Sequence, residues 1–185
     1  MLEALGQKLR AYAEKDGRGY PDWALRYGPI VRKLSHRRLQ RECILEIGAN
    51  ENGFARFAGV KTIVADRELA HVRKAREAQP VLPLVADIRN LPFADAAVDV
   101  CVCVDTFEHL PENIRGRAAE EILRVMKPSG EGVVAFPSGE AAAEAEDRIR
   151  EAYATYTGET LRWFEEHNEM GLPDAETVAA LFDRG

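Results

Sequence analysis

Residues 43–58 read CILEIGANENGFARFA, and this stretch decides the fold. The apolar run that ends near Gly48 has the composition of a buried strand, and the polar letters GANENG after it mark a turn. Taken alone, the Asn-Gly pair is equally typical of a hairpin tip. A hairpin would need a second strand at once, but a short helical segment at 53–58 comes first. The stretch therefore predicts a strand, a ligand-binding turn and a helix.

The rest of the chain repeats this alternation. Strands are predicted at 43–47, 62–65, 81–86, 98–104 and 132–136. Helices are predicted at 1–15, 22–40, 53–58, 67–78, 112–127, 140–157, 159–169 and 174–183. We expect Pro128 and Gly130 to end the helix at 112–127. Apolar strands joined by helices are typical of an α/β fold with a parallel sheet covered by helices.

Length and composition limit the class of protein. The chain has 185 residues, of which 46% are hydrophobic and 30% charged, as expected for one domain with a single core. Apolar runs are shorter than the roughly 18–20 residues that a membrane span needs. The N-terminal segment 1–17 is amphipathic, without the apolar stretch of a signal peptide. We therefore expect a cytoplasmic protein that does not bind membranes.

Cysteine and charge patterns exclude further classes. Cys43, Cys101 and Cys103 all lie in apolar strands, which favours reduced core thiols, and we expect no metal site. Residues 1–42 hold ten Lys and Arg against five Asp and Glu, but the basic residues near 32–41 alternate with apolar ones at helical spacing. That pattern indicates a solvated helix face. Nucleic-acid binding is not favoured, because no aromatic residues are interleaved there.

Acidic residues follow three successive predicted strands. Asp66, Asp87 and Asp105 end the second, third and fourth strands, and Glu46 lies near the end of the first. The carboxyl ends of parallel strands share one edge, where such sheets bind ligands. Asp66 is placed to accept hydrogen bonds from two ribose hydroxyls, and Asp87 from the exocyclic amine of a base. An acid can also cap the next helix, which is the alternative for any single one.

Four longer stretches resemble the class I S-adenosylmethionine-dependent methyltransferases, in particular the small-molecule "type 11" group. They are ILEIGANENGFARF (44–57), TIVADRELAHVRKA (62–75), PLVADIRNLPFADAAVDVCVCVDTFEHLP (83–111) and EEILRVMKPSGEGVVAFP (120–137). The resemblance covers roughly residues 43–137, and its most specific part is the third stretch. It implies a Rossmann-like parallel sheet of order 3-2-1-4-5 with helices on both faces.

The resemblance also implies roles at the sheet edge. Residues at the first turn would line the methionine end of S-adenosylmethionine; they are Glu46, Gly48, Ala49 and Asn50. Asp66 would hold the ribose, with Arg67 beside the adenine.

Three further positions follow from the later strands. Asp87 would meet the adenine amine, and Ile88 would pack on the ring or bond to it. Asp105 and Thr106 would offer backbone near the sulfonium. His109 would face the reaction side as the catalytic candidate, with a structural histidine at a helix start as the alternative.

Two departures from the family pattern stand out. Asn50 and Asn52 occupy positions where glycine is usual, and asparagine is the residue that best tolerates positive φ after glycine. The family's sheet also normally ends with two more strands, which are missing here. The chain's end directly after a predicted helix favours a truncated chain over a shortened fold. We expect an N-terminal helical extension at 1–42, the cofactor-binding core at 43–137 and a helical segment at 138–185.

Two aromatic segments are candidates for the acceptor side. Tyr20, Trp23 and Tyr27 could form a lid, or an amphipathic helix packed on the sheet edge. Trp163, Phe164 and His167 could line the acceptor site, and ordinary core packing is the alternative.

Three functions remain open from the sequence. The leading hypothesis is a methyltransferase that acts on a small-molecule acceptor, with a homodimer left open. The second is an inactive cofactor-binding module of a larger assembly. The third is an NAD-dependent oxidoreductase, which GANENG disfavours because it does not fit G-x-G-x-x-G.

Overall fold

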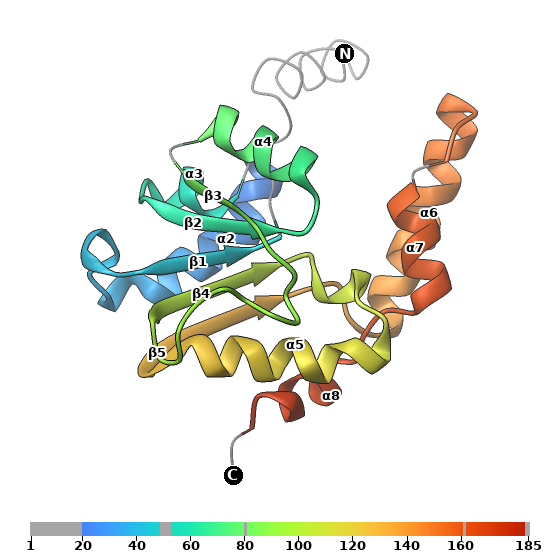
Figure 1. The fold of residues 1–185 in the computed structure, drawn as a ribbon. Helices are drawn as coiled ribbons and strands as arrows, with labels where there is room; N and C mark the ends of the chain where they lie inside the picture. The colour runs from blue at the N-terminus through green and yellow to red at the C-terminus, as the bar shows by residue number, and fades with distance from the viewer. Residues whose placement is uncertain (1–19, 49–52, 80, 161, 184–185) are drawn as a thin grey trace.

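A parallel sheet of five strands forms the centre of the molecule (Figure 1). The computed structural model describes residues 20–48, 53–79, 81–160 and 162–183. The strands are β1 (Ile44–Ile47), β2 (Thr62–Asp66), β3 (Val81–Val85), β4 (Val98–Val104) and β5 (Met126–Ala135). Their order is β3-β2-β1-β4-β5, and every neighbouring pair is parallel. The predicted fold class and strand order are confirmed.

Helices cover both faces of the sheet. The described helices are α2 (Tyr20–Lys33), α3 (Phe54–Ala58), α4 (Leu69–Ala78), α5 (Glu112–Val125), α6 (Gly139–Thr157), α7 (Arg162–Met170) and α8 (Ala175–Leu181). Short 3₁₀ turns lie at η1 (Leu34–His36), η2 (Leu39–Arg41) and η3 (Phe107–His109). The predicted helix at 1–15 lies outside the described residues.

Alternate residues of β4 contact opposite layers. Cys101 and Cys103 are buried in the cluster that includes Ile122 and Val178, on α5 and α8. Val100 and Val102 are buried in the second cluster, together with Tyr27 of α2 and Phe54 of α3. Since successive strand side chains point to opposite faces, a strand apolar throughout must be covered on both. The sheet is therefore the middle layer of three.

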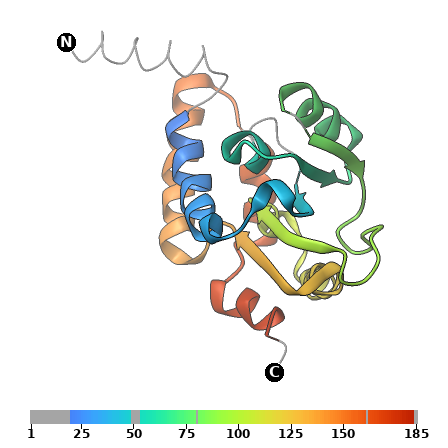
Figure 2. The ribbon, with the colours of Figure 1, turned by 90° about the vertical axis from the view of Figure 1, so that its left-hand side faces the viewer.

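The C-terminal helices lie at the carboxyl edge of the sheet. In Figure 1, α6 and α7 run side by side beyond the strand arrowheads, and α8 lies against α5. Figure 2, turned by 90°, views the molecule from the side opposite to α6 and α7. After Ala135 the described residues form helices and no strand, as predicted. This arrangement leaves the ends of β1, β2 and β4 facing the region where α7 meets η3.

Two predicted boundaries are wrong. The helix predicted at 112–127 ends at Val125, and β5 begins at once at Met126 rather than at 132. Pro128 and Gly130 thus lie in an irregular first part of the strand, where the register with β4 shifts. Lys127 holds this part in place, because its Nζ lies 2.8 Å from Oδ1 of Asp99 on β4.

The helix predicted at 22–40 ends at Lys33 instead. Apolar residues continue at helical spacing after Lys33, but the backbone becomes extended at Arg37, between η1 and η2. The Arg37 side chain donates to Oε2 of Glu42 at 2.9 Å and to the Ser129 carbonyl at 3.2 Å. These bonds draw the segment toward the sheet while Leu34 and Leu39 remain buried.

Among the described residues, none of the helices combines the length and the apolar character that crossing a membrane would require.

Candidate functional site

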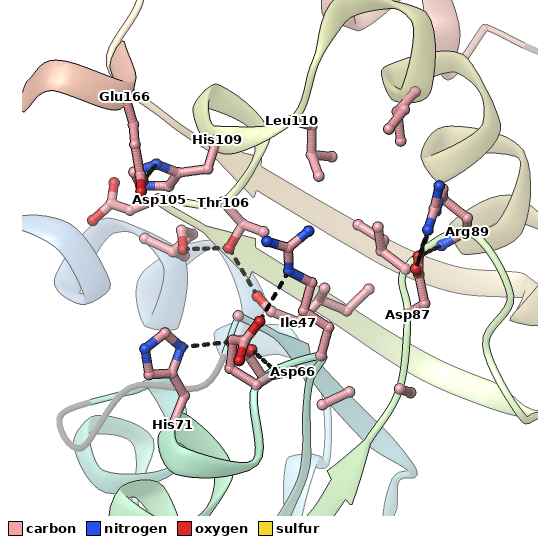
Figure 3. Close-up of a pocket in the computed structure, with 18 of the residues that line it drawn as sticks. Ile47, Asp66, His71, Asp87, Arg89, Asp105, Thr106, His109, Leu110 and Glu166 are labelled. Carbon is pink, nitrogen blue, oxygen red and sulfur yellow. Dashed lines mark hydrogen bonds and ion pairs between the residues drawn. The ribbon is translucent and has the colours of Figure 1, made fainter. Parts of the chain in front are cut away.

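The carboxyl edge of the sheet opens into one large cavity (Figure 3). Its volume is about 950 Å³, within the range of pockets that hold small molecules. Residues from the ends of β1, β2, β3 and β4 line it, together with α4, η3 and α7. The predicted site residues that line this cavity include Gly48, Asp66, Arg67, Asp87, Ile88 and Asp105. Thr106 and His109 line it as well.

Gly48 begins the turn after β1 in a conformation that excludes a side chain. Its φ is +90°, and its N–H donates to the Ala65 carbonyl at 2.9 Å. A Cβ at this position would overlap Oγ1 of Thr106. That hydroxyl donates to the carbonyls of Val104 and Ile47, at 3.1 and 3.3 Å. Gly48 and Thr106 thus pack against each other where β1 and β4 end, and both line the cavity.

Glu46 does not line the cavity. It is 1% exposed, and its Oε1 accepts the Phe54 N–H at 2.7 Å, so it fixes the start of α3. Burial raises the pKa of Glu46 to about 7. A Cβ on Gly53 would overlap both carboxyl oxygens, so this glycine lets the turn close over Glu46. Glu46 thus shapes the turn from beneath. Ala49 and Asn50, and also Asn52, lie outside the described residues.

Asp66 ends β2 with its carboxylate turned back to α4. Oδ1 accepts the Glu68 N–H at 2.7 Å, and Oδ2 lies 3.5 Å from Nδ1 of His71 (Figure 3). The side chain is 14% exposed. His71 was missed at the sequence level, although its position five residues after Asp66 places it in the first turn of the following helix. Arg67, the next residue, pairs with Glu68 at 3.4 Å.

Asp87 is held by a forked ion pair after β3. Nε and Nη2 of Arg89 lie 2.9 and 2.6 Å from its two carboxylate oxygens, and the Arg89 N–H adds a bond of 2.9 Å. The bonds from this guanidinium hold the pKa of Asp87 below its ordinary value. Ile88 is buried beside it. Arg89 was not predicted as a site residue, because its contact with Asp87 depends on the close turn between Asp87 and Asn90.

Asp105 ends β4 with a left-handed backbone, φ +48°. Its N–H donates to the Ala135 carbonyl at 2.8 Å, and its carboxylate pairs with Arg26 of α2. Aspartate is among the few residues that tolerate this conformation. The turn brings Thr106 under Gly48 and directs η3 toward α7.

His109 lies where η3 meets α7. Its Nδ1 is 3.4 Å from Oε2 of Glu166, and its Nε2 is 3.4 Å from Nε2 of His167. Burial, followed by the nearby His167, lowers the pKa of His109. Figure 3 draws His109 and Glu166 on the same side of the cavity as Asp105. Glu166 was missed, and His167 was named only as a candidate for the acceptor site, because α7 is far from η3 in the sequence.

The residues predicted for a lid or for the acceptor site lie in different places. Tyr27 is buried, lines the cavity and packs near Phe57, with ring centroids 6.4 Å apart. His167 is buried in contact with His109 and does not form part of the main cavity's wall. The side chains of Tyr20, Trp23, Trp163 and Phe164 lie outside the described part of the structure.

Comparisons with known proteins give the family that this sequence resembles. Residues 45–134 match the model of the methyltransferase domain family. A probable S-adenosylmethionine-dependent methyltransferase of Mycolicibacterium smegmatis is 31% identical over 120 residues, which cover 63% of this chain and 46% of the relative. The chain thus spans less than half the length of this curated relative.

Solved structures share the fold. The PH0226 protein from Pyrococcus horikoshii has a TM-score of 0.62 at 24% identity, over 74% of this chain and 62% of that chain. A SAM-dependent methyltransferase from Archaeoglobus fulgidus has a TM-score of 0.61 at 15% identity, over 83% of this chain and 64% of that chain. At these identities the likeness extends to the fold alone.

Proposed function

Residues 45–134 belong to the methyltransferase domain family, and from this premise we propose that the chain binds S-adenosylmethionine and methylates a small molecule. One observation carries the proposal beyond family membership. The side chain-free backbone at Gly48 and the carboxylates of Asp66 and Asp87 line a single cavity at the carboxyl ends of the strands. Parallel sheets bind nucleotide-like ligands at this edge.

The residues present fit the proposed cofactor. Gly48 lines the cavity without a side chain, and Oγ1 of Thr106 lies where its Cβ would be, so the turn offers backbone to a ligand. Asp66 is proposed to hold the ribose: its carboxylate, which the Glu68 N–H and His71 orient, lines the cavity, and carboxylate oxygens accept hydrogen bonds from hydroxyls. Arg67 lines the cavity beside it and is proposed to lie along the adenine.

Asp87 and Ile88 are proposed to hold the base. Arg89 donates hydrogen bonds to the Asp87 carboxylate and lowers its pKa, which keeps Asp87 ionised. The ionised carboxylate is proposed to accept a hydrogen bond from an exocyclic amine. Ile88 offers an apolar surface at the cavity wall. Glu46, with Ala49 and Asn50, is proposed to shape the turn that receives the methionine end.

The reaction requires alignment more than an acid or a base. Bound S-adenosylmethionine supplies a methyl group on a positively charged sulfur. The chain itself would bind the two reactants, orient them and exclude water, and this alignment can account for much of the rate acceleration. We propose that the backbone at Asp105 and Thr106 lies near the reacting sulfur. His109 is proposed to face the acceptor, because it lines the cavity on the side of α7.

The acceptor is proposed to be a small molecule in the same cavity. About 950 Å³ is at the upper end of the range for small-molecule sites, which leaves room for a cofactor and an acceptor side by side. Leu110, Ile114 and Met170 supply apolar wall on the side away from β2.

Calorimetry on the full chain tests cofactor binding. S-adenosylmethionine and S-adenosylhomocysteine should both bind one to one, and NAD should not. Binding of NAD without the sulfonium cofactor would overturn the proposal in favour of an oxidoreductase.

Turnover separates an enzyme from an inactive binding module. The full chain should transfer a labelled methyl group from S-adenosylmethionine into a component of a metabolite extract. Cofactor binding with no transfer into any fraction would instead support the inactive module.

A further inference from the structure

Three potential metal ligands meet where η3 packs against α7. Glu108 and His109 lie on η3, and His167 comes from α7. One ligand atom of each side chain lies within 4.8 Å of the other two. Neither Glu108 nor His167 has a role in the proposed methyl transfer. The cluster is therefore a feature that the proposed function leaves unexplained.

The two imidazole rings face each other through their Nε2 atoms. These atoms are 3.4 Å apart, beyond the usual range of about 2.7–3.2 Å for a hydrogen bond from N–H. In a tetrahedral zinc site with Zn–N bonds of about 2.1 Å, two ligand nitrogens lie about 3.4 Å apart. The separation thus fits two rings that share an ion better than two rings that share a proton.

Both rings have a carboxylate at the opposite nitrogen. Nδ1 of His167 lies 2.9 and 3.0 Å from the two oxygens of Glu146, within hydrogen-bond range, whereas Nδ1 of His109 lies 3.4 Å from Oε2 of Glu166, a longer ion-pair distance. A carboxylate at Nδ1 favours a proton on that atom, which leaves the Nε2 lone pair to act as a ligand. This is the outer arrangement that orients metal-binding histidines in proteins.

Glu108 supplies a buried carboxylate beside the two rings. The residue is 1% exposed, and among the described residues its Oε2 has no hydrogen-bond partner. An ionised carboxylate is costly to bury unless it is paired or bound to a metal ion. A cation at this position would supply the missing partner.

We propose that Glu108, His109 and His167 bind a divalent transition-metal ion through one carboxylate oxygen and the two Nε2 atoms. Two imidazoles and one carboxylate suit Zn²⁺ or Co²⁺, whereas Mg²⁺ prefers oxygen ligands. Three protein ligands leave a position for water or another ligand. Because His109 also lines the main cavity, the ion would lie at the cavity wall.

This proposal departs from our expectation of no metal site. The histidines are 58 residues apart, so no short ligand spacing marks the site in the sequence. Only the packing of α7 on η3 brings them together.

Metal titration of the full chain tests the site without any cofactor. After treatment with a chelator, the chain should bind one Zn²⁺ in calorimetry and raise its Tm. His109→Ala and His167→Ala should each weaken binding about 100-fold or more. Glu146→Gln, which keeps size but removes the charge, should weaken it by about 10- to 100-fold. His36→Ala is the matched control, since His36 is an exposed histidine on η1 and should leave affinity unchanged.

Co²⁺ reports which atoms coordinate. Binding should give visible absorption bands of a site with nitrogen and oxygen ligands. An intense thiolate charge-transfer band would assign the ion to cysteine and overturn the proposal. Failure of the native chain to bind Zn²⁺ or Co²⁺ would also overturn it, as would equal affinity in His109→Ala. His109 is a third exposed, so this variant should keep the fold even where His167→Ala does not. All of these results are independent of methyl transfer.

Discussion

Gly48 lies against Thr106 so closely that a Cβ at position 48 would overlap the threonine hydroxyl. The contact joins the turn after β1 to the turn after β4, and the hydroxyl also bonds the Ile47 carbonyl at 3.3 Å. One glycine and one threonine therefore determine how close the two central strand ends lie. The shape of the proposed cofactor site depends on this spacing.

Gly48→Ala should lose both stability and cofactor binding. The variant adds a steric overlap to a positive φ of +90°, and we expect a cost of about 2–3 kcal/mol in the free energy of unfolding. Affinity for S-adenosylhomocysteine should fall at least about tenfold. Chemical denaturation and calorimetry measure the two effects.

Gly59→Ala is the matched control for this prediction. Gly59 also has a positive φ, +65°, but a Cβ there would meet no atom within 4 Å. Gly59→Ala should lower the free energy of unfolding by only about 1 kcal/mol and should leave cofactor affinity unchanged. Adding Thr106→Ala to Gly48→Ala should recover part of the loss, since it removes the overlapping hydroxyl. Strictly additive effects in the double variant would contradict the overlap.

Asp66→Ala should weaken cofactor binding by about 1–3 kcal/mol, because charge-assisted hydrogen bonds to hydroxyls would be lost. Asp66→Asn keeps the shape and one acceptor oxygen, so it should lose less. Calorimetry with S-adenosylhomocysteine gives both values. Asp95→Ala serves as the control, since Asp95 is highly exposed and pairs with Arg124 outside the cavity. Equal affinities in Asp66→Ala and the native chain would remove Asp66 from the ribose role.

The sheet was predictable from the sequence because its signals are local. The run 98–104 is buried on both faces of the sheet, and every residue in it except Asp99 is apolar. The acids at Asp66, Asp87 and Asp105 were predictable for the same reason, since each directly follows a strand. The start of β5 was not, because Met126 pairs with Val98 through tertiary contacts that override Pro128 and Gly130 as helix-stop signals.

The partners of the site residues were beyond prediction from sequence. Glu166 and His167 reach His109 only because α7 packs against η3. Glu46 was expected at the ligand, but its side chain turns beneath α3 and bonds the Phe54 N–H. Strand position alone fixes which edge a residue lies on, whereas the direction of its side chain depends on the packing of the next helix.

The thiols of β4 should be unreactive in the native protein. Burial raises the pKa of Cys101 to about 12 and that of Cys103 well above its ordinary value, so neither forms the reactive thiolate near neutral pH. Cys43 is only partly buried, although burial raises its pKa as well. A chromogenic disulfide reagent should therefore titrate at most Cys43 in the native chain, and all three cysteines after unfolding. Rapid reaction of two or more native thiols would contradict the burial of β4.

Glu46→Gln should change how stability depends on pH. The pKa of Glu46 is about 7 in the folded chain against an ordinary value of 4.5. Between these values the folded state holds a proton that the unfolded state has released, so the free energy of unfolding falls as pH rises through this window. The difference corresponds to about 3 kcal/mol at most. Glutamine cannot ionise and keeps an acceptor for the Phe54 N–H, so it removes this loss.

Denaturation at several pH values measures the effect. The native chain and Glu46→Gln should have similar stability at pH 5, and the variant should be the more stable one at pH 8. Comparing the two chains at each pH isolates Glu46 from Glu108, whose burial also raises its pKa to about 7 and which both chains retain. Glu144→Gln, on the exposed face of α6, should give no comparable gain. A stability difference that stays constant from pH 5 to pH 8 would contradict the raised pKa of Glu46 in the folded chain.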